Sequence, residues 1–524
     1  MALKNGRILE KPPNDPTSNT SRDSWDTALT FHHQGKLAEA EVHYWKVLLE
    51  RSDDIDLLCN LGSALSGQGK YNQAVACYHR AIAINPDDWR AHGNLGNTFR
   101  RMGKLDRAQA CYRHAIAIDD GVALLHYCLG GVLRQKGKLE DAAANLRKAR
   151  DLQPDYFDAF IALSAIEETT GKHDQARKTL LEGISLRPYY SEICSKEPLA
   201  SALLFFGLED CRFRLNEINN IHLSGGHFLT NEFLRRQKFT KHHYHISGNN
   251  LLSDACSLPP HELIVNTIAC PDREPRSLET LSRYLRDNPH APVINAPQDV
   301  LQTTRNGNYS RLHGCQGITF PMTLRAGRQN LTAIIEESGI AFPIIIRRVG
   351  TQSAVSTRKI MKHDDITDYL DTTEGDEFYA IAYIDCRFRE KYYRKLRLFS
   401  IDGKLYPVVC HIDAVWNVHG GNRKTLMKQN SWMQDEEKRF LEDFTAYIGP
   451  KNRRRLESLH SIIKLDFYGI DFTIMDDNSI LIFELNPAMR HSLVHAEALP
   501  YLTPYLNKIS EAFETMAMRK VKGR

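Results

Sequence analysis

The chain has 524 residues, enough for two to four domains that each bury their own core. Its apolar (42%) and charged (25%) fractions are ordinary for globular proteins, and a net charge of +4 is too small to favour nucleic acid as the main partner. There is no apolar leader, no run of eighteen apolar residues and no Cys-x-x-Cys pair among the eleven cysteines. We therefore expect a cytoplasmic protein with free thiols and no membrane partner.

The first third of the chain is periodic. Gly-Lys recurs at 35, 69, 103, 137 and 171, at intervals of 34 residues, and an alanine stands four positions after each lysine. The same interval separates Leu61, Leu95, Leu129 and Leu163, and also Tyr44, Tyr78 and Tyr112. This pattern resembles the tetratricopeptide repeat family, whose units are pairs of helices. The resemblance implies an all-α helical repeat solenoid of about five repeats over residues 22–190.

The resemblance also implies a function for this array. Such solenoids present an extended concave surface, so we expect it to bind a peptide or protein. A scaffold or dimerisation surface is the alternative. Residues 1–21 are polar and predicted to be a disordered N-terminus. The segment 191–237 is interpreted as a capping or connector segment, in which an apolar run from Leu199 to Leu208 either caps the last repeat or begins the next domain.

Strand-like and helical runs alternate over residues 238–300, which predicts a small α/β subdomain with a parallel sheet. Asn266 and Asn295 fall at predicted strand ends, where ligands often bind, although asparagine also forms turns. His242, His243 and His245 lie along one predicted strand without a partner cluster, and we expect them at the surface.

Basic residues follow two predicted strands of the region 301–510. One buried strand ends in Arg347-Arg348 and leads into a polar loop at Gly350, and this combination of cations and backbone amides suits phosphate. Further on, a hairpin turning at Asp402-Gly403 aligns Lys395 and Arg397 on one face. Basic pairs at strand ends are also common on solvated edges.

The segment from Leu465 to Asn486 predicts a β-hairpin that turns at Asp477-Asn478. This turn places Asp471 opposite Glu484, with Asn486 on the same face. The other face is apolar and consists of Ile470, Phe472, Ile474, Leu481, Phe483 and Leu485. Two carboxylates roughly 5 Å apart cost stability unless a positive charge lies between them. Two carboxylates and an amide oxygen suit Mg²⁺. An ordinary hairpin with solvated acidic residues is the alternative.

The order of these segments resembles the ATP-grasp superfamily over residues 240 to 510, and the Asp471–Glu484–Asn486 spacing resembles its D-alanine ligase type. The resemblance implies an α+β ATP-grasp-like fold over 301–510 that binds ATP and Mg²⁺. It places the metal ligands at Asp471, Glu484 and Asn486.

The remaining roles implied by the resemblance fall on basic and substrate-facing residues. They are nucleotide binding by Arg305, Arg347 and the backbone of Ala382, Tyr383 and Ile384, catalysis by Arg397 and Arg490, and substrate contacts by Trp416, Asn417 and His419. A simple turn is the alternative for the segment from Trp416 to His419. Both lysines of the family pattern are arginine here, which leaves an atypical or inactive nucleotide site open.

The function implied is an Mg-dependent, ATP-dependent carboxylate–amine ligase that forms an acyl-phosphate. Its substrate would be a peptide, a protein or a biosynthetic intermediate presented with the help of the repeats. The alternatives are an ATP-grasp kinase and a non-catalytic adaptor with a degenerate nucleotide site. Residues 511–524 are expected to be a solvated basic tail.

Overall fold

The computed structural model describes residues 19–187, 189–194, 197–209, 212–216, 218–219, 221–225, 227–228, 233–246, 258–288, 290–351, 356–418, 425–489, 496 and 499–523. The chain forms two compact units. The first consists of Met1–Arg187 and Arg212–Leu223, and the second of Pro188–Cys211 and Ser224–Arg524. Among the helices described, none combines the length and apolar character needed to cross a bilayer.

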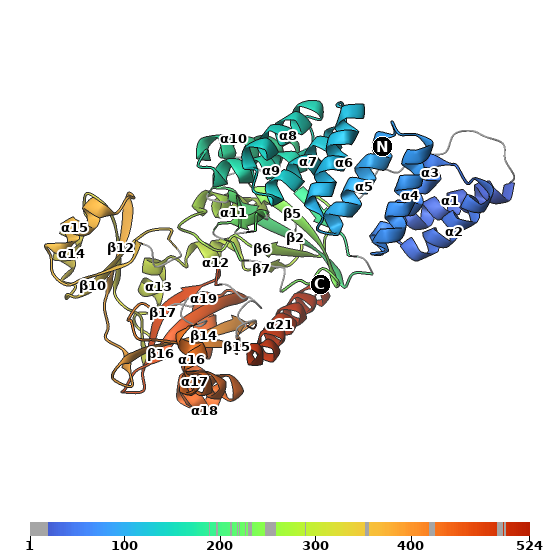
Figure 1. Ribbon diagram of the computed structural model, residues 1–524. Helices are drawn as coiled ribbons and strands as arrows, with labels where there is room; N and C mark the ends of the chain where they lie inside the picture. Colours follow the sequence, from blue (N-terminus) through green and yellow to red (C-terminus); the bar gives the residue numbers. More distant parts are fainter. Residues whose placement is uncertain are drawn as a thin grey trace. The chain divides into compact units, whose positions relative to one another are not determined.

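The first unit is an array of helix pairs (Figure 1). Within the described residues its ten helices are α1 Asn19–His33, α2 Leu37–Glu50, α3 Ile55–Gly67, α4 Tyr71–Ile84, α5 Trp89–Arg101, α6 Leu105–Ile118, α7 Ala123–Gln135, α8 Leu139–Leu152, α9 Phe157–Thr169 and α10 His173–Leu186. The predicted all-α solenoid is confirmed, and its first helix begins at Asn19.

Close helix packing explains the periodic residues. Tyr78 lies so near Gly62 that a Cβ on the glycine would sit 2.7 Å from the ring, and Gly96 has the same relation to Tyr112 at 2.9 Å. The glycine of each Gly-Lys pair ends a turn with positive φ, for example +82° at Gly69, which only glycine adopts at little cost.

The connector expected at 191–237 is not one segment. The strands β1 Tyr189–Glu192 and β2 Ala200–Gly207 belong to a sheet of the second unit. The strands β3 Arg212–Leu215 and β4 Ile221–Ser224 pair with each other, and Arg212–Leu223 belongs to the array.

The second unit begins with a five-stranded sheet in the order β1-β5-β2-β6-β7. Its other elements are β5 Phe239–Ile246, β6 Leu263–Asn266, α11 Pro275–Asp287, β7 Val293–Ile294 and α12 Pro297–Leu301. β2 pairs in parallel with both β5 and β6, and β6 with β7. The predicted mixed α/β region is therefore present. The expectation of surface histidines was wrong, since β5 lies between β1 and β2 and buries His242, His243 and His245.

Two further sheets follow, which Figure 1 shows below and to the left of the first. The four-stranded sheet β11-β10-β12-β9 carries the helices α14 and α15. The six-stranded sheet has the order β13-β14-β16-β17-β8, with β15 paired to β14.

The bounds of the elements in this region are α13 Arg305–Leu312, β8 Ile318–Thr319, β9 Thr323–Gly327, α14 Leu331–Ser338, β10 Ile344–Arg348, β11 Arg358–Ile360, α15 Asp365–Thr372, β12 Glu377–Ala382, β13 Arg387–Phe388, β14 Tyr392–Ile401, β15 Lys404–Asp413, α16 Leu426–Gln429, α17 Ser431–Glu442, α18 Phe444–Ile448, α19 Pro450–Ile463, β16 Phe467–Ile474, β17 Ile480–Asn486, the 3₁₀ helix Pro500–Leu502 and α21 Thr503–Lys522.

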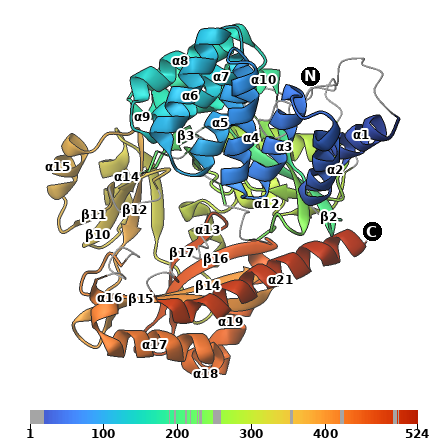
Figure 2. The same cartoon turned by 45° about the vertical axis from the view of Figure 1, so that its right-hand side comes forward.

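The C-terminal residues 511–524 were expected to be a solvated tail, but residues 511–522 form the second half of α21, which packs against β14 and β15 (Figure 2). Phe513 is fully buried there, with ring centroids 4.8 Å from Phe233 and 5.5 Å from Phe467. Lys520 forms an ion pair with Asp466, with its Nζ 2.8 Å from a carboxylate oxygen. The apolar spacing within this segment is that of an amphipathic helix and outweighs its basic composition.

We predict that Phe513→Ala destabilises the second unit by about 3–5 kcal/mol, because it opens a cavity among packed phenylalanines. Thr515→Ala, on the exposed face of the same helix, should change stability by no more than about 0.5 kcal/mol. Hydrogen exchange of the buried β16 amides measures unfolding of this unit alone. Equal effects of the two substitutions would show that α21 does not pack as described.

Candidate functional site

The β16–β17 hairpin pairs the predicted residues at its centre, but its loop and the pairing next to the loop differ from the prediction. Asp471 lies opposite Glu484 and Gly469 opposite Asn486. The loop, however, has three residues: Met475 N–H donates to the Ser479 carbonyl, and Asn478 supplies the positive φ, +62°. A bulge then shifts the pairing between Asp471 and Phe472. The longer loop and the bulge offset one another, so the register at the carboxylates is unchanged.

The bulge changes which residues face the core. The sequence predicted Leu481 and Phe483 on the apolar core face, but both line a cavity together with Glu484. Phe472, Ile480 and Ile482 are fully buried. The β17 strand therefore contributes both apolar and acidic side chains to the cavity, and the prediction for Leu481 and Phe483 was wrong.

Cations neutralise the two facing carboxylates. Arg397 binds Asp471 with two hydrogen bonds, Nε–Oδ1 at 2.7 Å and Nη2–Oδ2 at 2.9 Å, and Lys395 Nζ lies 3.4 Å from Oδ2. Arg305 Nη2 lies 2.7 Å from Glu484 Oε1. Two close carboxylates were expected to need positive charge, and basic residues of β14 and α13 supply it.

These ion pairs set the charge states of the site. Burial by itself would raise the pKa of Asp471, but Arg397 and Lys395 lower it to about 2. Burial would likewise raise the pKa of Glu484, and Arg305 and Arg347 hold it below its usual value. Asp471 also raises the pKa of Arg397. Both carboxylates are therefore ionised at neutral pH.

Two of the three predicted magnesium ligands have a position that suits Mg²⁺. Among the described residues, no group of three or more His, Cys, Asp or Glu side chains could hold a metal by itself. Glu484 Oε1 accepts from both Arg305 and Asn486, and Asn486 Oδ1 accepts from the Ala488 amide at 2.6 Å. Mg²⁺ commonly takes only one or two carboxylates and completes its shell with phosphates and water. Glu484 and Asp471 would hold such an ion, with Asn486 positioning Glu484.

Arg347, on β10, lies at the loop expected to cradle phosphate. Its guanidinium donates to the backbone carbonyl of Thr351. Burial and the neighbouring Arg305 lower the pKa of Arg347 to about 10, so it remains charged at neutral pH. Two desolvated guanidinium groups near one another favour a bound anion. Gln352 and Ser353, which the sequence placed in this loop, lie outside the described residues.

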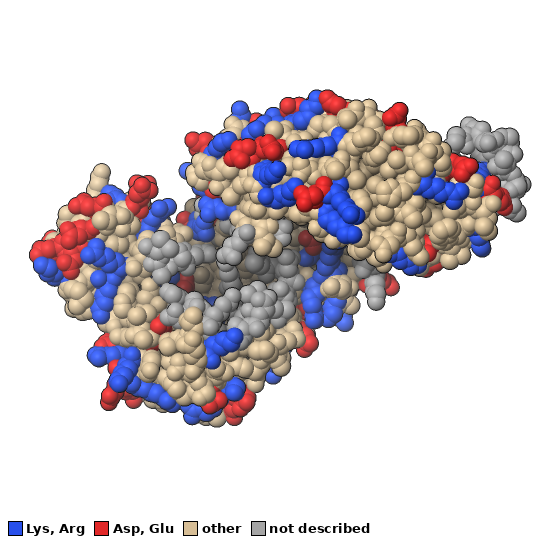
Figure 3. All heavy atoms as spheres, in the orientation of Figure 1, with Lys and Arg blue, Asp and Glu red and all other residues tan. Residues whose placement is uncertain are grey.

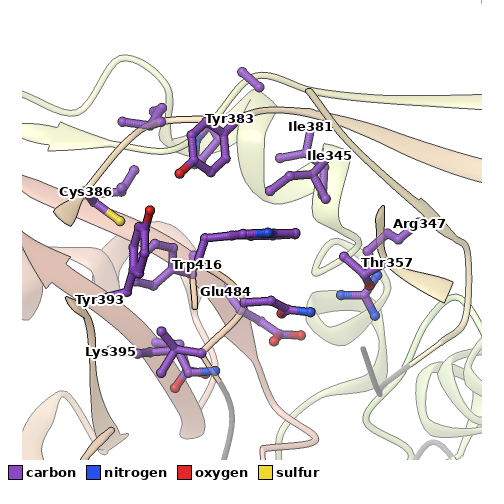
Figure 4. Close-up of a pocket in the computed structure, with 18 of the residues that line it drawn as sticks. Ile345, Arg347, Thr357, Ile381, Tyr383, Cys386, Tyr393, Lys395, Trp416 and Glu484 are labelled. Carbon is purple, nitrogen blue, oxygen red and sulfur yellow. The ribbon is translucent and has the colours of Figure 1, made fainter. Parts of the chain in front are cut away.

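Together these residues enclose a cavity of about 200 Å³ between the four- and six-stranded sheets. In Figure 4, Tyr383, Ile381 and Ile345 lie above the Trp416 indole, and Lys395 and Glu484 lie below it. The upper side of the cavity in this view is thus aromatic and apolar and is called the aromatic end, and the lower side is called the charged end.

The strand β12 and the residues that follow it form the aromatic end, and Trp416 lies beside it. The Trp416 and Tyr383 rings meet edge to face, with centroids 6.1 Å apart. The Ala382 amide donates a hydrogen bond to the Met322 carbonyl, and the Tyr383 amide donates one to the Pro343 carbonyl. These two amides are therefore engaged within the protein. Ile384 also lines the cavity. The three residues expected to contact adenine therefore lie at the cavity, but two of their amides stabilise the sheet.

The structure brings most predicted site residues together. The cavity is lined by Arg305, Arg347, Ala382, Tyr383, Ile384, Trp416, Asn417, Asp471 and Glu484. Arg397 is not among the lining residues, whereas Lys395 of the same strand is. Arg490 and His419 lie outside the described residues. Sequence reasoning assigned no role to Lys395, Tyr393 or Cys386, although the alternation of β14 already placed Lys395 beside Arg397.

A second, smaller pocket adjoins the charged end and shares Arg305 and Glu484 with the cavity. Its wall includes Asp272, which accepts from the Tyr379 hydroxyl at 2.8 Å and lies 3.1 Å from Arg325. Burial raises the pKa of Asp272 in spite of these partners.

Asn266 and Asn295, considered as ligand-binding residues, have structural roles instead. The Asn266 amide donates to the Asn295 carbonyl. The Asn295 side chain exchanges hydrogen bonds of 2.7 and 2.9 Å with the Phe467 backbone.

We predict that Asp471→Asn destabilises the second unit by about 3 kcal/mol, because it leaves Arg397, whose side chain is only 18% exposed, without its partner. Asp471 has a pKa of about 2 in the folded state against about 3.8 in the unfolded chain, so its contribution is complete above pH 4 and is lost as the pH falls toward 2. The wild-type advantage over Asp471→Asn should therefore shrink by roughly 2 kcal/mol over that range. A pH-independent difference, measured by β16 hydrogen exchange, would contradict this ion pair.

A second prediction tests the bulge in β17. Ile482→Ala should cost about 2–5 kcal/mol, because Ile482 is fully buried in the core. Phe483→Ala should cost less than about 2 kcal/mol, because its ring lines a cavity. Denaturation of the two neighbouring variants under identical conditions compares them directly. A larger loss of stability in Phe483→Ala than in Ile482→Ala would show that β17 has no bulge and that the hairpin is regular.

Comparisons with known proteins concern the array. Tetratricopeptide repeat family models match residues 55–88, 77–110 and 127–191. No curated protein matches significantly. Similar solved structures include a MamA fragment from Desulfovibrio magneticus RS-1 (19% identity, 32% of this chain and 96% of that chain, TM-score 0.29). Another is a thermophilic TPR protein of Thermus thermophilus (20% identity, 32% and 92%, TM-score 0.29). The family-model matches show that the N-terminal array is made of tetratricopeptide repeats, which typically bind peptides or proteins.

Proposed function

We propose that the cavity binds ATP with Mg²⁺ and that the chain is an ATP-dependent carboxylate–amine ligase resembling the ATP-grasp superfamily. The observation that carries this proposal is the polarity of the cavity: an aromatic and apolar end faces a charged end that holds several cations and two ionised carboxylates. A nucleoside triphosphate has the same polarity.

The aromatic end would hold the base. Ile345 and Ile381 lie on one wall, Leu481 and Phe483 on another, and Trp416 between the two ends. Apolar walls with a few polar groups are typical of small-molecule sites, and an aromatic ring favours stacking with a flat base.

The charged end would hold the phosphates. Arg305, Arg347 and Lys395 line it, and all three remain near Asp471 or Glu484 through ion pairs or charge interactions. A guanidinium can bind two phosphate oxygens at once, so arginine at the two lysine positions of the family pattern is compatible with phosphate binding. When bound, Mg²⁺ would neutralise phosphate charge beside Glu484 and Asp471. Arg397 acts as a positioning residue, because it holds Asp471.

The reaction requires positioning more than a covalent residue. An oxygen of the substrate carboxylate attacks the γ-phosphorus, the bond to the β-phosphate oxygen breaks, and ADP leaves. The amine nitrogen then attacks the acyl carbon, phosphate leaves with the bonding electrons, and the nitrogen loses a proton. Arg305 lies between the cavity and the second pocket, so that pocket is the place for the acceptor. The repeats would deliver a peptide or protein substrate.

Two alternatives keep part of this scheme. A kinase would stop after phosphoryl transfer. A non-catalytic adaptor is favoured by the tetratricopeptide repeats and by the two arginines at lysine positions.

The nucleotide site can be tested by calorimetric titration of the full chain with Mg·ATP. We predict that Arg347→Ala weakens binding about 10- to 100-fold, because it removes charge-assisted hydrogen bonds worth roughly 1.5–3 kcal/mol. Arg347→Lys should retain most of the affinity. Arg286→Ala, a control whose side chain is 72% exposed on α11, should change it less than twofold.

If Arg347→Ala binds Mg·ATP as tightly as wild type, Arg347 does not bind the phosphates. ADP release with mixtures of carboxylates and amines separates the candidate functions. A ligase forms ADP, phosphate and an amide; a kinase forms ADP and a phosphorylated acceptor; and an adaptor forms neither.

A further inference from the structure

The β3–β4 hairpin is an insertion that belongs to one unit while its neighbours in sequence belong to the other. The chain completes β2 in the second unit, contributes Arg212–Leu223 to the array, and returns to the second unit at Ser224. β3 packs against α9, the first helix of the last repeat (Figure 2). In helical-repeat arrays the first helices line the concave face, where partners bind.

A buried acid anchors the hairpin. Glu168, 5% exposed at the C-terminal end of α9, accepts from Arg214 Nη2 at 2.9 Å and from Arg212 Nη1 at 3.4 Å. Burial would raise the pKa of Glu168, but His173 and the two arginines lower it. A carboxylate at a helix C-terminus meets the negative end of the helix dipole, so it depends on cations from outside the helix.

The other contacts are those of a bound peptide. Leu215 N–H donates to Thr169 Oγ1 at 3.0 Å, and Arg134 of α7 donates to the Asn219 carbonyl. Leu215 and Ile221 pack against the apolar core of the array. Backbone hydrogen bonds, two apolar anchors and an arginine pair thus occupy the α7–α9 face, as an extended ligand would.

The two arginines that bind Glu168 are themselves only partly buried. Arg212 and Arg214 remain 41% and 49% exposed, and ion pairs with exposed partners contribute little. An isolated two-stranded hairpin is also only marginally stable. On the face of the array that Figure 3 shows, basic and acidic side chains of the described residues lie side by side.

The base of the insertion is fixed independently of the hairpin. The Gly207 amide at the end of β2 donates to His227 Nε2 at 3.0 Å, and His227 pairs with Ile268. Burial, His245 and Arg273 lower the pKa of His227 to about 3, so its neutral ring can accept this bond. The base of the insertion is therefore held by contacts within the second unit that do not involve the hairpin.

We propose that β3–β4 is a tethered ligand of the array, and that the partner of the α7–α9 face is a protein segment with two arginines two residues apart, which binds Glu168 in exchange for the hairpin. In an extended strand, residues two apart point to the same side, so both guanidinium groups reach one carboxylate. The hairpin is then an intramolecular competitor that sets a threshold for partner binding. This inference concerns the array and does not depend on ATP binding.

The experiment uses the full chain and a fluorescein-labelled synthetic peptide with the sequence of residues 212–223. A tethered copy competes at an effective concentration in the millimolar range, so wild type should bind the peptide weakly. The double variant Arg212→Ala/Arg214→Ala should bind it at least tenfold more tightly by fluorescence anisotropy. Adding Glu168→Gln should remove this gain, and the control Arg286→Ala should match wild type.

Equal affinity in wild type and the double variant, or a gain that survives Glu168→Gln, would overturn the proposal. Hydrogen exchange of wild type gives a second test that needs no variant. The Leu215 amide should exchange at least tenfold faster than the buried amides of α9, and excess peptide should accelerate it further. If the Leu215 amide is as well protected from exchange as the buried amides of α9, the hairpin is a permanent part of the array.

Discussion

Two carboxylates that face one another across a single hairpin impose the main constraint on the second unit. Asp471 and Glu484 occupy directly opposed positions of β16 and β17, and Asp471 is almost completely buried. Such a pair is unfavourable unless each charge has a partner. Arg397 from β14 and Arg305 from α13 provide these partners, so one electrostatic requirement holds together elements far apart in sequence. The charged end of the cavity follows from this arrangement.

The same constraint gives the site its chemical character. Arg347 and Lys395 add positive charge beyond what the two acids neutralise, and the cavity is otherwise lined by apolar and aromatic side chains. An anion with a flat apolar part fits both features. The array follows a different logic, because each repeat buries its apolar face against the next one. Its small residues are dictated by close packing, as with Gly62 beneath Tyr78. Neither unit needs the other to explain its own core.

The sequence predicted the parts of the fold that depend on local pattern. A strict interval of small and aromatic residues identifies the repeats, and strand alternation with a turn places Asp471 opposite Glu484. Sequence-based prediction failed for features that depend on packing between distant segments.

The bulge that turns Phe483 toward the cavity depends on the backbone of β17. The helix α21 is held by Phe233 and Phe467, both of which are far from it in sequence. The role of Lys395 required knowing that β14 pairs with β16. The β3–β4 insertion could not be predicted, because its partner Glu168 lies in another part of the sequence.

The central claim is that the cavity between the four- and six-stranded sheets is a nucleotide site, and photolabelling tests it most directly. The full chain would be irradiated with 8-azidoadenosine triphosphate and Mg²⁺, digested, and analysed by mass spectrometry, with and without excess ATP. The account predicts label on residues 381–386 or 416–418, at the aromatic end of the cavity, and loss of that label when ATP competes. Label confined to the helical array, or label at the cavity that ATP does not reduce, would contradict it.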